Sequence, residues 1–165
     1  YEDIRQEIAR ILVEDKGVPK TNLQAKVPVH FQIDGGQHQR LVDLVLRDDQ
    51  QGALMTVMFC AGQVETYIRQ TLAAARLLPQ GPSRLAVITD TRKALVMQVA
   101  DGKLVQEGSF DQLPSWSELL NMLSELPAYT LTPDKKSKEE RLLYALTELS
   151  CSCSQESCSL PGEDG

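Results

Sequence analysis

Apolar residues recur at two different spacings along the chain, and the change from one to the other predicts a series of helices and strands. Spacings of three and four residues, typical of amphipathic helices, occur in residues 2–16, 64–78, 115–126 and 134–149. Alternating or continuous apolar residues, typical of strands, occur in residues 26–33, 40–47, 53–60, 84–89, 94–99 and 103–107. This order predicts an α/β domain whose mixed β-sheet is flanked by helices.

Several details indicate where individual elements lie. Residues 53–60 are almost entirely apolar, as expected of a central strand that is covered on both faces. Pro28 cannot donate a backbone hydrogen bond, so its strand is expected near an edge of the sheet. The strand at 84–89 follows a helix, and such a crossover predicts parallel pairing with a neighbour. Ser115 and Glu118 have the spacing of a capping box at the start of a helix.

The chain of 165 residues is long enough for one domain with its own core, which we expect over residues 1–149. Within this domain, residues 115–149 form a helical extension of the sheet region. Residues 150–165 are rich in serine, glycine and acidic side chains and are expected to form a disordered tail. No apolar run approaches the ~20 residues of a membrane helix, so no membrane partner is expected.

Charge and cysteine content narrow the classes of function. The net charge is −6, which argues mildly against tight nucleic-acid binding, although a local basic patch remains compatible with it. Cys60 lies in an apolar run, whereas Cys151, Cys153 and Cys158 lie close together near the end. Three cysteines lack the fourth ligand of a zinc site, and they do not form a disulfide framework. We therefore expect a reducing, cytoplasmic location.

Four segments of the chain carry a resemblance to a known family. They are YEDIRQEIARILVEDKGVPKTNLQAKVPV, RLVDLVLRDDQQGALMTVMFCAGQV, YIRQTLAAARLL and LAVITDTRKALVMQVADGKLV. Together they resemble the N-terminal nuclease domain of the restriction subunits of type I restriction enzymes. The resemblance implies a restriction-endonuclease-like fold of the PD-(D/E)-x-K superfamily. It also implies a metal-dependent site that hydrolyses phosphodiester bonds in DNA.

In that family an Asp on the second strand is followed by Glu-x-Lys on the third, and the carboxylates hold the metal. Asp43 stands at the position of the Asp, but Phe59 stands at that of the Glu and Ala61 at that of the Lys. A phenyl ring cannot ligate magnesium, which requires oxygen ligands, and a methyl group carries no charge. Cys60, between them, matches a residue common in relatives.

The helix expected at residues 64–78 also lacks a side chain of the family pattern. Members of the family carry Gln-x-x-x-Tyr there, and this chain keeps Gln70 but has Ala74 at the tyrosine position. Without the resemblance, Gln70 would be interpreted as a helix-surface residue. These changes predict a decayed catalytic centre that needs no cofactor. We expect an inactive domain that acts as a binding or interaction module, with DNA or an unidentified protein as its partner.

The alternative is an active magnesium-dependent nuclease with a rearranged site. Glu65 would then replace the missing Glu, and Lys93 or Arg69 the missing Lys. Glu2 would add a metal ligand from the first helix, although acidic residues at a helix start also complement the helix dipole. This alternative requires the carboxylate of Glu65 to converge on Asp43.

Asp43 itself can be interpreted as a metal ligand, as the relic of one, or as an ordinary Asp that faces solvent at a sheet edge or bonds to backbone in a partly buried groove. A buried carboxylate needs a partner, and we expect Arg40 or a group on the first helix to supply it. The relic is the interpretation that agrees with the loss of the neighbouring Glu and Lys.

Overall fold

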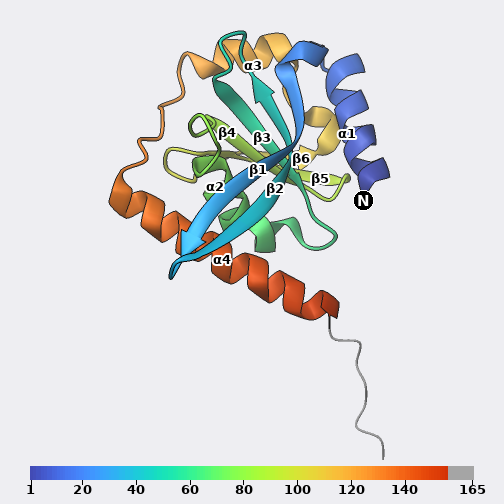
Figure 1. Cartoon of the computed structure of the whole chain (residues 1–165). Coiled ribbons are helices and arrows are strands. Elements are labelled where there is room, and N and C mark those ends of the chain that lie inside the picture. The colour runs from blue at the N-terminus through green and yellow to red at the C-terminus, as the bar shows by residue number, and fades with distance from the viewer. Residues whose placement is uncertain (156–165) are drawn as a thin grey trace, which may run out of the picture.

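Six strands form one mixed β-sheet, and helices cover both of its faces in the computed structural model, which describes residues 1–155, with side chains up to residue 147 (Figure 1). The strands are β1 (Leu23–Ile33), β2 (Gly36–Arg47), β3 (Ala53–Phe59), β4 (Leu85–Thr89), β5 (Lys93–Gln98) and β6 (Leu104–Ser109). The helices are α1 (Glu2–Glu14), α2 (Ile68–Arg76), α3 (Trp116–Leu123) and α4 (Pro133–Gln155), with short 3-10 turns at Lys20–Asn22, Val64–Tyr67 and Phe110–Gln112. The predicted α/β architecture is confirmed.

The strands lie in the sheet in the order of the sequence, from β1 to β6. Neighbours are antiparallel except β3 and β4, which run parallel from Met55 and Leu85 to Phe59 and Thr89. The chain reaches β4 through α2, so the predicted crossover and parallel pairing are confirmed. The strand β1, which contains Pro28, lies at one edge of the sheet, as predicted.

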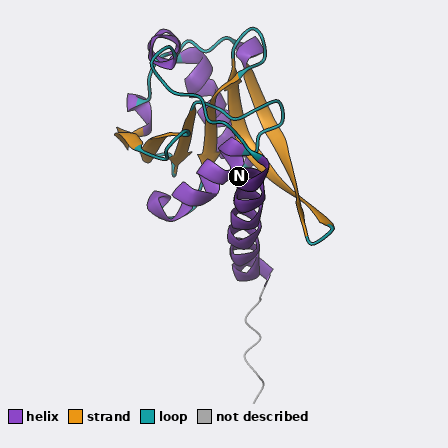
Figure 2. Cartoon of the chain, turned by 90° about the vertical axis from the view of Figure 1, so that its left-hand side faces the viewer, coloured by secondary structure: helices purple, strands orange, loops and turns teal. Residues whose placement is uncertain are grey.

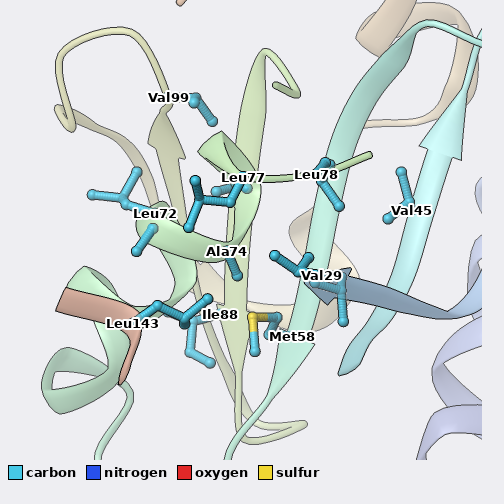
Figure 3. Packing of buried hydrophobic residues seen from close by; sticks show 14 of the residues in the cluster. Val29, Val45, Met58, Leu72, Ala74, Leu77, Leu78, Ile88, Val99 and Leu143 are labelled. Carbon is cyan, nitrogen blue, oxygen red and sulfur yellow. The ribbon is translucent and has the colours of Figure 1, made fainter. Parts of the chain in front are cut away.

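One face of the sheet is covered by α2 and α4. Figure 3 shows this cluster, in which Leu72 and Ala74 of α2 and Leu143 of α4 pack over Met58 of β3 and Val29 of β1. Ala74 and Leu143 are completely buried. The small alanine side chains of α2 let this helix lie close to the sheet.

The opposite face is covered by α1 and α3. Ile8 and Leu12 of α1 and Leu119 of α3 belong to a second cluster that includes Val57 of β3. Because Met58 faces the first cluster and Val57 the second, every residue of β3 is buried. The prediction of a central strand covered on both faces is therefore confirmed.

The β1–β2 hairpin is longer than the sequence predicts, since β2 begins at Gly36 rather than at residue 40. Asp34 and Gly35 at its tip have φ values of 48° and 78°, as a tight turn between twisted strands requires. The ring of His38 lies 4.7 Å from that of Tyr144 on α4. Figure 2 shows the hairpin extending beyond the other strands. The polar start of β2 is thus held by packing against a distant helix.

The start of α3 and the end of α4 can be compared with the helix boundaries that the sequence predicts. Ser115 Oγ accepts from the backbone N–H of Glu118, and the carboxylate of Glu118 accepts from the backbone N–H of Ser115. The predicted capping box is therefore confirmed. Helix α4 continues to Gln155, beyond its predicted end at residue 149.

Helix α4 is joined to α2 by a mostly buried ion pair. Arg76 Nη1 lies 2.8 Å from Glu139 Oε1, and Nε and Nη2 of Arg76 both donate to the carbonyl oxygen of Val99. One guanidinium therefore links α2, the end of β5 and α4. The helical extension packs on the sheet domain through this contact and through Leu143.

The end of the chain lies partly outside the described structure. Residues 156–165, which include Cys158, are outside the described structure. The side chains of Cys151 and Cys153 are outside it as well. The predicted disorder of the tail therefore stays a prediction for these residues. In the described part of the chain, no helix is both long and apolar enough to cross a membrane.

Candidate functional site

The candidate site lies where β2 and β3 separate. Pairing between these strands extends from Arg47 to Leu44 on β2, and the preceding part of β2 is paired with β1. Asp43 is the next residue, and its Oδ2 accepts the backbone N–H of Phe59 at 2.9 Å. The carboxylate thus takes over the position of a backbone acceptor at the last residue of β3.

The charge of Asp43 is compensated by Arg5 on α1. Arg5 donates from Nε at 3.0 Å and from Nη2 at 2.8 Å, both to Oδ1 of Asp43. The two side chains are only 10% and 4% exposed, so both charges are withdrawn from water. The expectation that a first-helix group holds Asp43 is confirmed.

Tyr1 completes the environment of Asp43. Its hydroxyl lies 3.3 Å from Oδ2 of Asp43 and 3.1 Å from the carbonyl oxygen of Phe59. Burial, followed by the negative charge of Asp43, raises the pKa of Tyr1 to about 12. An ionised carboxylate offers about four lone-pair sites. Arg5 donates twice to Oδ1 and the backbone N–H of Phe59 donates to Oδ2, while the single hydroxyl proton of Tyr1 lies within reach of both Oδ2 and the nearer carbonyl oxygen of Phe59.

Glu2 lies on the other side of the Arg5 guanidinium. Its carboxylate accepts from Nη1 of Arg5 and pairs with Lys26 Nζ at 2.8 Å. The hydrogen bond from Lys26 is the main cause that lowers the pKa of Glu2. Arg5 therefore lies between two carboxylates, Glu2 and Asp43.

The two replaced motif positions differ in their surroundings. The ring of Phe59 belongs to the core under α1, with its centroid 5.2 Å from that of Tyr1 in an edge-on arrangement. Ala61 is exposed and lies beyond the end of the strand. The predicted strand at 53–60 ends one residue earlier, at Phe59, although the backbone N–H of Cys60 still donates to the carbonyl oxygen of Thr89 on the neighbouring strand.

Glu65 is engaged elsewhere. Its carboxylate pairs with Lys93 Nζ, which also lies 2.7 Å from Oε1 of Glu107. The hydrogen bond from Lys93 lowers the pKa of Glu65. The structure thus brings together the two proposed replacements, Glu65 and Lys93, but it pairs Asp43 with Arg5 instead. Among the described residues, no group of three His, Cys, Asp or Glu side chains could hold a metal ion.

Gln70 is buried and not a helix-surface residue. It is 3% exposed, and its Nε2 has no hydrogen-bond partner. The helix-surface interpretation is wrong because α2 is covered by the sheet on one side and by α4 on the other. Ala74 is completely buried in the same helix, so its position has become part of the core.

A pocket of about 320 Å³ opens in front of Asp43. It is lined by Tyr1, Arg5, Gln39, Arg40, Leu41, Asp43 and Thr147. Sequence reasoning did not identify Tyr1, Arg5 or Thr147 as site residues. A signal was present for Arg5, because it stands on the apolar stripe of α1 with Ile8 and Leu12 at a spacing of three and seven residues. A charged residue on such a stripe indicates a buried partner.

Comparison with known proteins adds the family. Among curated proteins, no sequence matches the chain. Two of the solved structures that match are restriction enzymes, described as a DrdV–DNA complex and as the type IIG restriction endonuclease BpuSI. They are 20% and 14% identical to the chain and superpose with TM-scores of 0.47 and 0.44. They cover 76% and 91% of this chain, which spans only 12% and 17% of their length.

The sequence model of the family described as "Type I restriction enzyme R protein N terminus" matches residues 1–114. The match includes α1, the whole sheet and α2, and thus every residue around Asp43 except Thr147. It confirms the resemblance that the four sequence segments indicate. The chain, an α/β domain with one mixed sheet, therefore belongs to the family of the type I restriction enzyme R protein N terminus.

Proposed function

We propose that this domain is a catalytically inactive member of its family and acts as a binding module. The observation that carries the proposal is the Asp43 carboxylate, whose oxygens accept from Arg5, Tyr1 and the backbone of Phe59. A divalent cation could bind there only by displacing an arginine that already neutralises the charge. Breaking such a buried pair is strongly unfavourable.

Magnesium does not fit the residues that are present. It requires oxygen ligands in an octahedral arrangement, and Phe59 and Ala61 supply none. Arg5 provides a fixed positive charge beside Asp43, but a guanidinium is always protonated and cannot generate hydroxide from water. The site therefore keeps electrostatic balance without the means to activate a nucleophile.

Family membership makes DNA the partner that we propose. The net charge of −6 opposes binding over a large surface, so we expect contact at a local site rather than along an extended basic face. We place the protein in a reducing cytoplasm, because its four cysteines are not spread through the fold as they are in a secreted domain held by disulfides.

The test is a cleavage assay on single- and double-stranded DNA with magnesium or manganese. We expect no metal-dependent product from the wild-type chain and no change in Asp43→Ala. Cleavage that Asp43→Ala abolishes would overturn the proposal. A parallel Glu65→Gln variant examines the rearranged nuclease, since activity lost in both variants would establish the alternative. Glu118→Gln, in the cap of α3, is a control for the removal of one carboxylate.

A further inference from the structure

Arg40 differs from the other arginines that are withdrawn from solvent. Arg5 pairs with Asp43, Arg76 with Glu139, and Arg47 and Arg84 donate to amide or carbonyl oxygens. Arg40 is half-buried, and its Nε has no hydrogen-bond partner. In the described part of the chain, Arg40 is the one arginine with a buried side-chain nitrogen that has no hydrogen-bond partner. A partly desolvated charge of this type favours binding of an anion.

A second unpartnered polar atom lines the same pocket. Thr147 on α4 has a buried Oγ1 without a hydrogen-bond partner. Its hydroxyl does not make the bond to the carbonyl four residues earlier that Thr71 makes with Tyr67 on α2. Thr147 can therefore donate to a ligand in the pocket. Arg40 and Thr147 face this pocket from β2 and α4 respectively.

The remaining charges in the pocket do not oppose an anion. Asp43 is negative, but its oxygens are covered by donors from Arg5, Tyr1 and Phe59. Glu2 lies outside the pocket lining, and its negative charge is compensated by Arg5 and Lys26. The uncompensated charge that lines the pocket is the cation of Arg40.

We infer that Arg40 and Thr147 bind a single phosphate group without a metal ion. Donors that approach from two elements suit a tetrahedral anion with several acceptor oxygens better than a planar carboxylate. The site depends on α4, which lies beyond the residues 1–114 that match the family. The inference rests on the proposed function, because the uncompensated charge in the pocket is that of Arg40 only while Arg5, and no metal ion, neutralises Asp43.

The experiment is titration of the full chain with inorganic phosphate in buffer containing a chelator, followed by amide chemical shifts and calorimetry. We expect saturable shifts at residues 39–41 and 147. Arg40→Gln should weaken binding by about tenfold or more, as expected for the loss of a charge-assisted hydrogen bond. Thr147→Val, which keeps the side-chain shape, should weaken it severalfold. Arg10→Gln removes the same charge from the exposed face of α1 and should bind as the wild type does.

Three further probes distinguish the source of the phosphate. They are a nucleoside monophosphate, a 5′-phosphorylated single-stranded oligonucleotide and the same oligonucleotide without its terminal phosphate. Stronger binding of the phosphorylated strand indicates a terminal phosphate, and equal binding of both strands at residues 39–41 indicates an internal phosphodiester. Either outcome supports the phosphate site, provided that Arg40→Gln weakens the binding.

The inference is wrong if phosphate and the phosphorylated strand produce no saturable shift at these residues. It is equally wrong if Arg40→Gln binds as the wild type does, or if acetate binds as tightly as phosphate. Should Arg40→Gln fail to fold, Thr147→Val decides the question. Metal-dependent cleavage would overturn the proposed function while leaving phosphate binding measurable, so the two failures are distinguishable.

Discussion

Arg5 donates from both Nε and Nη2 to a single oxygen of Asp43, at 3.0 and 2.8 Å. The two residues are 38 positions apart in the sequence, and the contact joins α1 to the point where β2 and β3 separate. It places a permanent cation beside the carboxylate that we propose to be the relic of a metal ligand. In that proposal the guanidinium of Arg5 takes the place of the metal ion.

Removal of Arg5 should be strongly destabilising. In Arg5→Ala the carboxylate of Asp43 stays buried without its cation, which we expect to cost about 3–5 kcal/mol in the free energy of unfolding. Urea denaturation followed by circular dichroism measures this loss. The double variant Arg5→Ala/Asp43→Ala should be more stable than Arg5→Ala alone, because no uncompensated charge remains.

Arg10→Ala is the matched control for this prediction. Arg10 pairs with Glu7 and Glu14 on the same helix, but its side chain is 46% exposed. Exposed pairs contribute little to stability, so the midpoint should stay close to that of the wild type. A loss as large as that in Arg5→Ala would show that the effect comes from helix charge rather than from the buried pair.

The attachment of α4 should depend on Arg76. In Arg76→Ala, Glu139 and the carbonyl oxygen of Val99 lose charge-assisted hydrogen bonds, with an expected cost of at least about 2 kcal/mol. Hydrogen exchange should become faster in α4, between Pro133 and Thr147, more than in β3. Lys136→Ala removes an exposed charge from the same helix and serves as the control. Unchanged exchange in Arg76→Ala would contradict the role of this ion pair.

The titration of Tyr1 should distinguish it from the other tyrosines. Its pKa is raised to about 12 by burial and by Asp43, against an ordinary value of 10. A raised pKa adds stability that is present below pH 10 and is lost as the pH rises from 10 towards 12. Because the burial of Tyr1 is partial and the residue as a whole is 60% exposed, we expect a shallow decline in stability. The difference in tyrosinate absorbance between wild type and Tyr1→Phe reports this pKa, and a midpoint near 10 would contradict it.

Cys60 should be unreactive in the folded chain. It is 3% exposed, and burial is the main cause that raises the pKa of its thiol. A variant with Cys151, Cys153 and Cys158 changed to serine leaves Cys60 as the single thiol. Alkylation near neutral pH should be slow in native buffer and fast in denaturant. Equal rates in the two conditions would show that the end of β3 opens readily.

Much of the fold could be predicted because its signals are local. The apolar run at 53–60 identified the central strand, and the crossover before 84–89 identified parallel pairing. The start of β2 was misplaced because its polar residues carry no strand pattern. It is held instead by a tight turn and by packing of His38 against Tyr144 on α4.

The sequence by itself determined the order of the elements, the family, and the absence of Glu and Lys side chains at Phe59 and Ala61, since residue chemistry and spacing are visible along the chain. The tertiary structure alone decided that Arg5 holds Asp43 and that Arg40 and Thr147 line the same pocket. The burial of Gln70 was also decided by the tertiary structure, because the sheet and α4, which cover it, come from other parts of the chain. Contacts of this kind depend on strand register and helix packing, which join residues far apart in sequence and leave no local pattern.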